Sequence, residues 1–238
     1  MSEYLVRETA LPYQDRTEQV NALFRKVYQW MALGLILTAV MAYVVASSRT
    51  MLGMLYGSGA GVAIVAIVEV GLVLWLSARI QRLSVATAAT LFLVYSVLNG
   101  VLCSAVLLVY TQGSVYNAFL STAGMFAVMS VWGLYTQRDM TSFGSFLRMG
   151  LWGLIIAMLA NLFMGSSMMD IYISVFAILI FLGMTAWDTW KIRQIAHDME
   201  DGADGEWGRK VAIMGALALY LDFINLFLHL LRLFGKRR

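Results

Sequence analysis

Four polar residues recur along one apolar segment near the C-terminal end of the chain. Within the run 211–234, the residues Asp222, Asn225, His229 and Arg232 are spaced three or four positions apart, and most of the intervening residues are leucine, isoleucine or phenylalanine. At about 3.6 residues per turn, this spacing places all four side chains on one face of a helix. If the helix crosses a membrane, that face should point into a bundle or a water-filled cavity. The alternative is an amphipathic helix that lies on the membrane surface.

Two further acidic residues belong to apolar segments. Glu69 lies in the middle of the run 59–78, and Asp188 closes the run 171–187. An ionisable residue inside a membrane helix costs roughly 2.5–3.5 kcal/mol on insertion scales, and it therefore marks a candidate functional site. The alternative for Asp188 is a solvated charge at a helix end, paired with Lys191.

The sequence lacks the motifs of common enzymes and metal sites. No serine has the G-x-S-x-G pattern of a nucleophile elbow, and no Walker-type phosphate loop occurs. His197 and His229 are the only histidines, and no cysteine lies near either one, so a His/Cys zinc cluster is excluded. The acidic segment 198–206 lacks the glycine and acid spacing of an EF-hand. We therefore predict that the protein is not an enzyme and needs no cofactor.

The composition identifies the solvent in which these residues lie. The chain has 238 residues, of which 61% are hydrophobic and 13% are charged, whereas a soluble domain is about 45–50% apolar and about 25% charged. A single core in a short chain cannot bury so much apolar surface, which indicates a membrane protein with lipid as its partner. The net charge of +3 is small, so nucleic acid is not an expected partner.

Seven apolar runs are long enough to form membrane-spanning helices. Each is close to the roughly 20 residues that cross the hydrocarbon core as a helix, and none alternates as a barrel strand does. We predict an all-α membrane protein, a seven-transmembrane-helix bundle with a central, polar-striped C-terminal helix. Residues 1–26 form the expected cytoplasmic tail, and residues 27–238 form the expected transmembrane domain. The runs are 27–46, 59–78, 85–110, 115–135, 146–164, 171–187 and 211–234.

The basic residues predict the orientation of the bundle. The N-terminal tail and the second, fourth and sixth loops carry most of them, whereas the first, third and fifth loops carry only Arg49. Because basic loops stay in the cytoplasm, we expect a cytoplasmic N-terminus. The longest loop, 188–210, is charged and lies on the same side. Four basic residues follow or end the last run, so the sequence leaves open whether that run spans or re-enters; these are Arg232, Lys236, Arg237 and Arg238.

Two segments resemble a known family. The segment Ala-Leu-Ala-Leu-Tyr-Leu-Asp-Phe-Ile-Asn-Leu-Phe at 216–227, followed by Leu-Leu-Arg at 230–232 and by Gly235, resembles the C-terminal signature of the Bax inhibitor-1, or transmembrane Bax inhibitor motif, family. The segment Trp-Asp-Thr-Trp-Lys-Ile at 187–192 resembles the Tyr-Asp-Thr-Gln-x-Ile element of that family. The seven-run layout agrees, and the chain looks like a bacterial-type member.

The resemblance implies a specific function. In the family, the aspartates that match Asp188 and Asp222 share protons, sense pH and gate a slow calcium leak. A basic residue on the second helix pairs with them, and Arg79 is its best match here. The family places that residue eleven positions after the glutamate, but Arg79 follows Glu69 by ten. Arg79 should therefore point about 100° away from the family's face.

Elementary chemistry agrees with this function. Two carboxylates that are close together at low dielectric cannot both ionise cheaply, so the pair holds protons in common. Calcium prefers carboxylate and carbonyl oxygens, and Asp188, Asp222 and Glu69 are the acids available for a weak calcium site. Asn225 and His229 share the helix face of Asp222. Together with Glu69, they form a candidate ion pathway.

Two other functions remain open. Some bacterial relatives are known to modulate a membrane-bound protease, so a regulatory protein with a protease partner is one alternative. A proton-coupled transporter is the other, because intramembrane acids can relay protons. No organelle signal is visible, which favours a bacterial inner membrane. The sequence does not define the oligomeric state.

Overall fold

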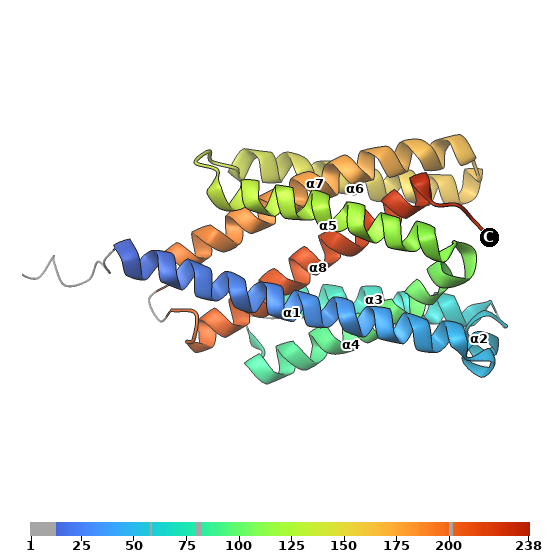
Figure 1. The fold of residues 1–238 in the computed structure, drawn as a ribbon, viewed down its shortest axis with the longest axis horizontal. Coiled ribbons are helices and arrows are strands. Elements are labelled where there is room, and N and C mark those ends of the chain that lie inside the picture. Colours follow the sequence, from blue (N-terminus) through green and yellow to red (C-terminus); the bar gives the residue numbers. More distant parts are fainter. Residues whose placement is uncertain (1–12, 58, 80–81, 200–201) are drawn as a thin grey trace, which may run out of the picture.

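The computed structural model describes the fold of residues 13–57, 59–79, 82–199 and 202–238 (Figure 1). Its regular secondary structure is entirely α-helical, apart from one isolated β-bridge. Seven helices are long and apolar enough to cross a membrane, and the remaining helix, α2, is short. The predicted class of all-α, seven-helix membrane bundle is therefore confirmed. The helices are α1 (Tyr13–Ser47), α2 (Arg49–Tyr56), α3 (Ala60–Arg79), α4 (Val85–Val109), α5 (Gln112–Tyr135), α6 (Thr141–Met164), α7 (Ser167–His197) and α8 (Glu206–Phe234).

The last helix, α8, lies at the centre of the bundle. It runs diagonally between the other helices in Figure 1 and packs against α1, α4, α5 and α7. In its most apolar window 72% of the residues are buried, compared with at most 39% in any other spanning helix. Its buried Leu219, Tyr220 and Leu226 are fully enclosed by neighbouring helices. The prediction of a central C-terminal helix is confirmed, and the alternative of a surface helix is wrong.

Three helices extend well beyond the apolar runs. α7 continues to His197 and α8 begins at Glu206, so the predicted loop 188–210 is reduced to residues 198–205. The physical reason is that the charged segment after Asp188 keeps buried residues at helical spacing, Ile192 and Ala196. Arg193 of this extension is half-buried and donates a hydrogen bond to the carbonyl of Leu134 in α5 at 2.6 Å.

The same pattern extends α1 at its start. Val20, Leu23 and Val27 are buried at spacings of three and four residues, and they continue the helix into the predicted tail. Residues 13–26 are therefore helical. The rest of the predicted tail, residues 1–12, lies outside the described residues.

The bundle has two ends that can be defined by their connections. At the amino end, the start of α1 meets the α7–α8 connection, where Lys26 Nζ lies 2.5 Å from Asp204 Oδ1 and donates to the carbonyl of Ala203 at 2.7 Å. At the carboxyl end, the tail after α8 is hydrogen-bonded to the α4–α5 connection. The two contacts lie at opposite ends of Figure 1. The helix α8 therefore traverses the bundle and does not re-enter.

This topology predicts the accessibility of two introduced cysteines. With Cys103 replaced by serine, Asp198→Cys and Arg238→Cys should react with an impermeant maleimide from opposite sides of a sealed membrane. Both positions are exposed, so labelling reports the side of the membrane and not burial. Labelling of both cysteines from the same side would contradict a spanning α8.

Candidate functional site: a buried aspartate pair

Asp188 of α7 and Asp222 of α8 form a pair in the bundle interior. Their exposed fractions are 8% and 3%, and their carboxyl groups lie within hydrogen-bonding range of each other. Asp222 Oδ2 is buried and accepts no hydrogen bond from a donor among the described residues. Two carboxyl groups hydrogen-bond to each other only when a proton lies between them, because neither carboxylate is a donor. A proton held between the two groups would make them one proton-binding unit.

Close packing of α7 buries this pair. A β-carbon at Gly133 of α5 would overlap the carbonyl oxygen of Ala186, and one at Gly144 of α6 would overlap the Trp187 ring. Two glycines therefore let α5 and α6 approach α7 closely at Ala186 and Trp187, the two residues that precede Asp188. The helix continues for nine residues beyond Asp188, to His197. The alternative of a solvated helix-end charge at Asp188 is therefore wrong.

Two cations act on the carboxyl group of Asp188. They are Lys191 of α7 and Arg148 of α6. Both lie over the ring of Trp187, with Arg148 Cζ at 5.2 Å and Lys191 Nζ at 5.1 Å from the ring centroid. Contacts of this kind hold a cation near an aromatic face. The indole ring therefore keeps two positive charges close to the aspartate pair.

Arg79, the basic residue suggested by the family resemblance, lies elsewhere. It is exposed in the last turn of α3 and forms no ion pair with a described residue. The physical reason is the position of α3, which packs mainly against α4 and α2. The structure therefore does not bring Arg79 together with the aspartates.

The remaining polar residues of α8 continue toward the carboxyl end. Asn225 is half-buried, and its Nδ2 donates to the carbonyl of Leu221 at 2.8 Å. His229 is buried, its Nδ1 lies 3.5 Å from Ser174 Oγ, and its ring stacks on Phe181. The partners of His229 belong to α7, as does Asp188. The polar face of α8 is therefore lined, at least in part, by α7.

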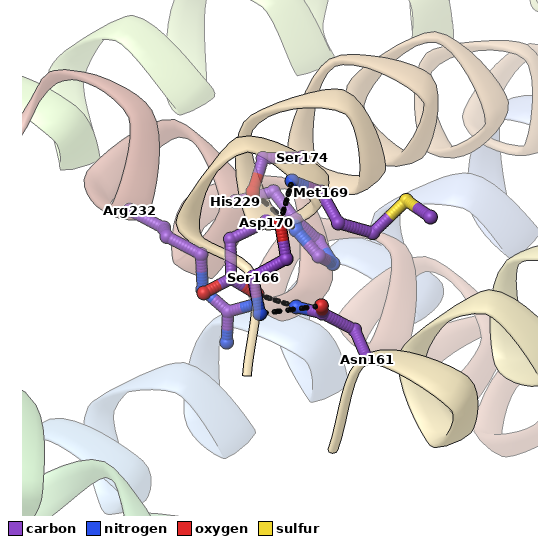
Figure 2. A network of polar contacts seen from close by, with 7 residues as sticks. All are labelled: Asn161, Ser166, Met169, Asp170, Ser174, His229 and Arg232. Atoms are coloured by element: carbon purple, nitrogen blue, oxygen red, sulfur yellow. Dashed lines mark hydrogen bonds and ion pairs between the residues drawn. The ribbon is translucent and has the colours of Figure 1, made fainter. Parts of the chain in front are cut away.

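This polar face ends in the network of Figure 2. Asp170, in the first turn of α7, accepts a hydrogen bond from Asn161 Nδ2 at 2.7 Å, and its Oδ1 lies 3.9 Å from Arg232 Nη1. Asn161 Oδ1 in turn accepts from the backbone N–H of Ser166 at 3.1 Å. Sequence reasoning missed Asp170 and Asn161. The sequence signal that could have found Asp170 was its position as an acid in the first turn of α7, together with the basic Arg232 in the last turn of α8.

Glu69 belongs to a different polar cluster. It is 6% exposed, and its Oε1 accepts from Asn99 Nδ2 at 2.6 Å. Its neighbour Tyr95 packs edge-on against Tyr220 of α8, with ring centroids 5.9 Å apart. Tyr220 precedes Asp222 by two positions and so points about 200° away from it on the helix. Glu69 and the aspartate pair therefore lie on opposite sides of α8.

The three acids proposed as weak calcium ligands thus do not form one cluster. Among the described residues, no group of three histidine, cysteine, aspartate or glutamate side chains is arranged to hold a metal ion. Asp188 and Asp222 are the two acids that the fold brings together. A cation at this site would have two carboxyl groups as protein ligands, which is an incomplete shell for calcium.

A seven-helix membrane bundle with a buried aspartate pair between its last two helices is the class that fold and site define. The family model described as Inhibitor of apoptosis-promoting Bax1 matches residues 20–238. The chain belongs to this family, the Bax inhibitor-1 family, and is a multi-pass membrane protein.

Bacterial relatives match over nearly their whole length. The inner membrane protein YbhL of Escherichia coli (strain K12) is 41% identical over 213 residues, which is 90% of this chain and 91% of the relative. An uncharacterized protein of Borreliella burgdorferi is 41% identical over 218 residues, or 92% of this chain and 93% of the relative. An uncharacterized protein of Rickettsia prowazekii is 42% identical over 221 residues, which is 93% of this chain and 92% of the relative.

Proposed function

We propose that the protein is a calcium leak channel of a bacterial inner membrane, gated by protonation of the Asp188–Asp222 pair. The observation that carries the proposal is the pair itself, two buried carboxyl groups on adjacent helices that face each other. Loss of the shared proton changes both the attraction of the site for calcium and the repulsion between α7 and α8. A single titration thereby couples helix packing to cation binding.

The path away from the pair follows the polar face of α8. Asn225 and His229 offer oxygen and nitrogen atoms between Asp222 and the carboxyl end. The face ends at Asp170 and Arg232, whose ion pair joins α7 to α8 (Figure 2). Weak, incomplete coordination along such a path suits a leak, because a conducted ion must leave each site again. Glu69 lies outside this path and is better placed to anchor α3 to α4.

Calcium entry into proteoliposomes tests this proposal. The purified chain should admit calcium faster than protein-free vesicles, at a rate that changes with pH over the range of cells. A calcium indicator inside the vesicles measures the initial rate. Entry no faster than in protein-free vesicles, or a rate independent of pH, would contradict the proposal.

The cations over Trp187 give a further prediction. Replacing Arg148 or Lys191 by glutamine should move the midpoint of the pH dependence of flux toward higher pH, by up to about one unit, because a nearby cation favours the carboxylate form. Arg79→Gln is the matched control, since Arg79 is exposed on α3 and should leave the midpoint unchanged. A shift with Arg79→Gln and none with the other two variants would refute this assignment.

A further inference from the structure

A groove at the carboxyl end of the bundle has two chemically different parts. Its volume is about 800 Å³, and residues of α5, α7, α8 and the C-terminal tail line it. Along α7 and α8 the lining is apolar and includes Val175, Leu179, Leu230 and Leu233. Along the first half of α5, by contrast, it is polar. The groove therefore offers one polar and one apolar surface to the same occupant.

The polar part of the groove has unpaired side chains. Ser114, Asn117 and Ser121 lie at spacings of three and four residues and share one face of α5. Asn117 and Ser121 are exposed on this membrane-crossing helix and have no hydrogen-bond partner among the described residues. An unpaired amide in contact with hydrocarbon is costly. These side chains thus favour an occupant that carries hydrogen-bonding groups.

The C-terminal tail brings positive charge to the mouth of this groove. Lys236, Arg237 and Arg238 are exposed, and Lys236 lines the groove. Backbone hydrogen bonds fix the tail, from the N–H of Thr111 to the carbonyl of Lys236 at 3.0 Å and from the N–H of Arg238 to the carbonyl of Val109 at 2.9 Å. The backbone that carries these charges is therefore fixed beside the groove.

Ser114 joins the tail to the polar part of the groove. Its Oγ accepts a hydrogen bond from the backbone N–H of Lys236 at 2.9 Å. The basic residues of the tail are also unusual for this end of the bundle, because Arg49 is the only basic residue in the first, third and fifth loops of the predicted layout. The tendency of basic loops to stay in the cytoplasm therefore does not explain the positive charge of the tail.

Another groove of the bundle shows the contrast. Between α6 and α7, a groove of about 640 Å³ is lined by residues such as Phe143, Phe146, Leu147 and Phe176, and it has no charged or amide side chain. An acyl chain alone satisfies such a surface. The groove at the carboxyl end adds hydroxyl, amide and ammonium groups to a similar apolar wall.

We propose that this groove binds an anionic phospholipid from the membrane leaflet at the carboxyl end. The phosphate lies at Lys236 and the start of α5, where the ammonium group matches its charge. The glycerol and ester oxygens accept hydrogen bonds along Asn117 and Ser121, and an acyl chain packs on Val175 and Leu179. From Ser114 to Met125 the groove descends about 16 Å along α5, which is roughly half of the hydrocarbon thickness.

Native mass spectrometry of the full chain tests this proposal. Phosphatidylglycerol should bind in preference to phosphatidylcholine with the same acyl chains. Lys236→Gln should reduce that preference about fivefold, which is the contribution of one basic residue near an anionic lipid surface. Arg49→Gln is the matched control, because Arg49 is an exposed basic residue at the same end but outside the groove.

A second variant tests the polar surface of α5 separately from the basic residues. Asn117→Leu with Ser121→Leu keeps all basic residues but removes the polar surface, and it should weaken the binding of both lipids, because both present the same glycerol and ester oxygens to Asn117 and Ser121. Equal binding of the two lipids, or equal losses in Lys236→Gln and Arg49→Gln, would overturn the proposal. Binding that the leucine variant strengthens equally for both lipids would identify an acyl-chain groove only and would also overturn it.

Discussion

The variants Asp188→Asn and Asp222→Asn are each expected to abolish the pH dependence of calcium flux. Each replacement leaves one carboxyl group facing an amide, so the proton shared between two acids no longer exists. The double variant should resemble either single variant, because residues that act as a unit are not additive. The asparagine side chain has nearly the same volume, so packing in the interior is preserved. Initial rates of calcium entry, measured over a series of pH values, provide the test.

Asp139 provides the control for this experiment. It is an exposed acid at the amino end of the bundle, and its Oδ1 accepts hydrogen bonds from the N–H and hydroxyl of Thr141 at 2.9 and 2.6 Å. These hydrogen bonds lower the pKa of Asp139 below its ordinary value, so it stays ionised at the pH of cells. Asp139→Asn should keep the wild-type pH profile. If Asp188→Asn or Asp222→Asn also keeps it, the shared-proton gate is wrong.

Gly133→Ala should have the largest effect on stability among single-methyl changes near the pair. The added β-carbon would overlap the main-chain carbonyl of Ala186, which cannot rotate away as a side chain can. The helices α5 and α7 must then separate beside Asp188. Overpacking of this kind costs about 1–3 kcal/mol, and the shift should also change the flux that depends on Asp188. A thermal melt in detergent and a flux assay measure the two effects.

Gly124→Ala on the same helix is the matched control. No atom lies within 4 Å of a β-carbon at Gly124, and alanine favours a helix more than glycine by about 1 kcal/mol. The control should therefore melt at the same temperature as the wild type or higher. A Gly133→Ala chain that is as stable as Gly124→Ala would contradict the close contact of α5 with α7.

Local patterns were sufficient to predict the existence of the seven spanning helices, but not all of their ends, and to predict the Asp222 half of the aspartate pair. The polar face of α8 follows from the spacing of Asp222, Asn225 and His229, because a helix repeats every 3.6 residues and lipid excludes polar groups. The central position of α8 followed from the same stripe. The buried position of Asp188 did not follow from a local pattern, because the apolar run ends just before this residue. Continuation of α7 depends on Ile192 and Ala196, which are buried between charged residues.

Apart from the pairing of Asp188 with Asp222, which the family resemblance implied, contacts between helices could not be predicted from one sequence. Arg79 stands at almost the expected distance from Glu69 along the chain, but α3 packs on α4, away from α7. Lys191 lies three positions after Asp188 on α7, so its approach was suggested by the sequence. Arg148 of α6 also lies over Trp187, and this contact between α6 and α7 has no local sequence signal. The separation of Glu69 from the pair also depends on the assembled bundle.

The titration of the pair itself is the most direct test of the shared-proton gate. Infrared difference spectroscopy of the chain with isotope-labelled aspartate reports carboxylic acid groups separately from carboxylates. The predicted result is a pH-dependent aspartic acid band whose midpoint coincides with that of calcium flux, and which both Asp188→Asn and Asp222→Asn change or remove at that midpoint. A band that titrates unchanged in either variant, or at a pH unrelated to the flux, would contradict the account.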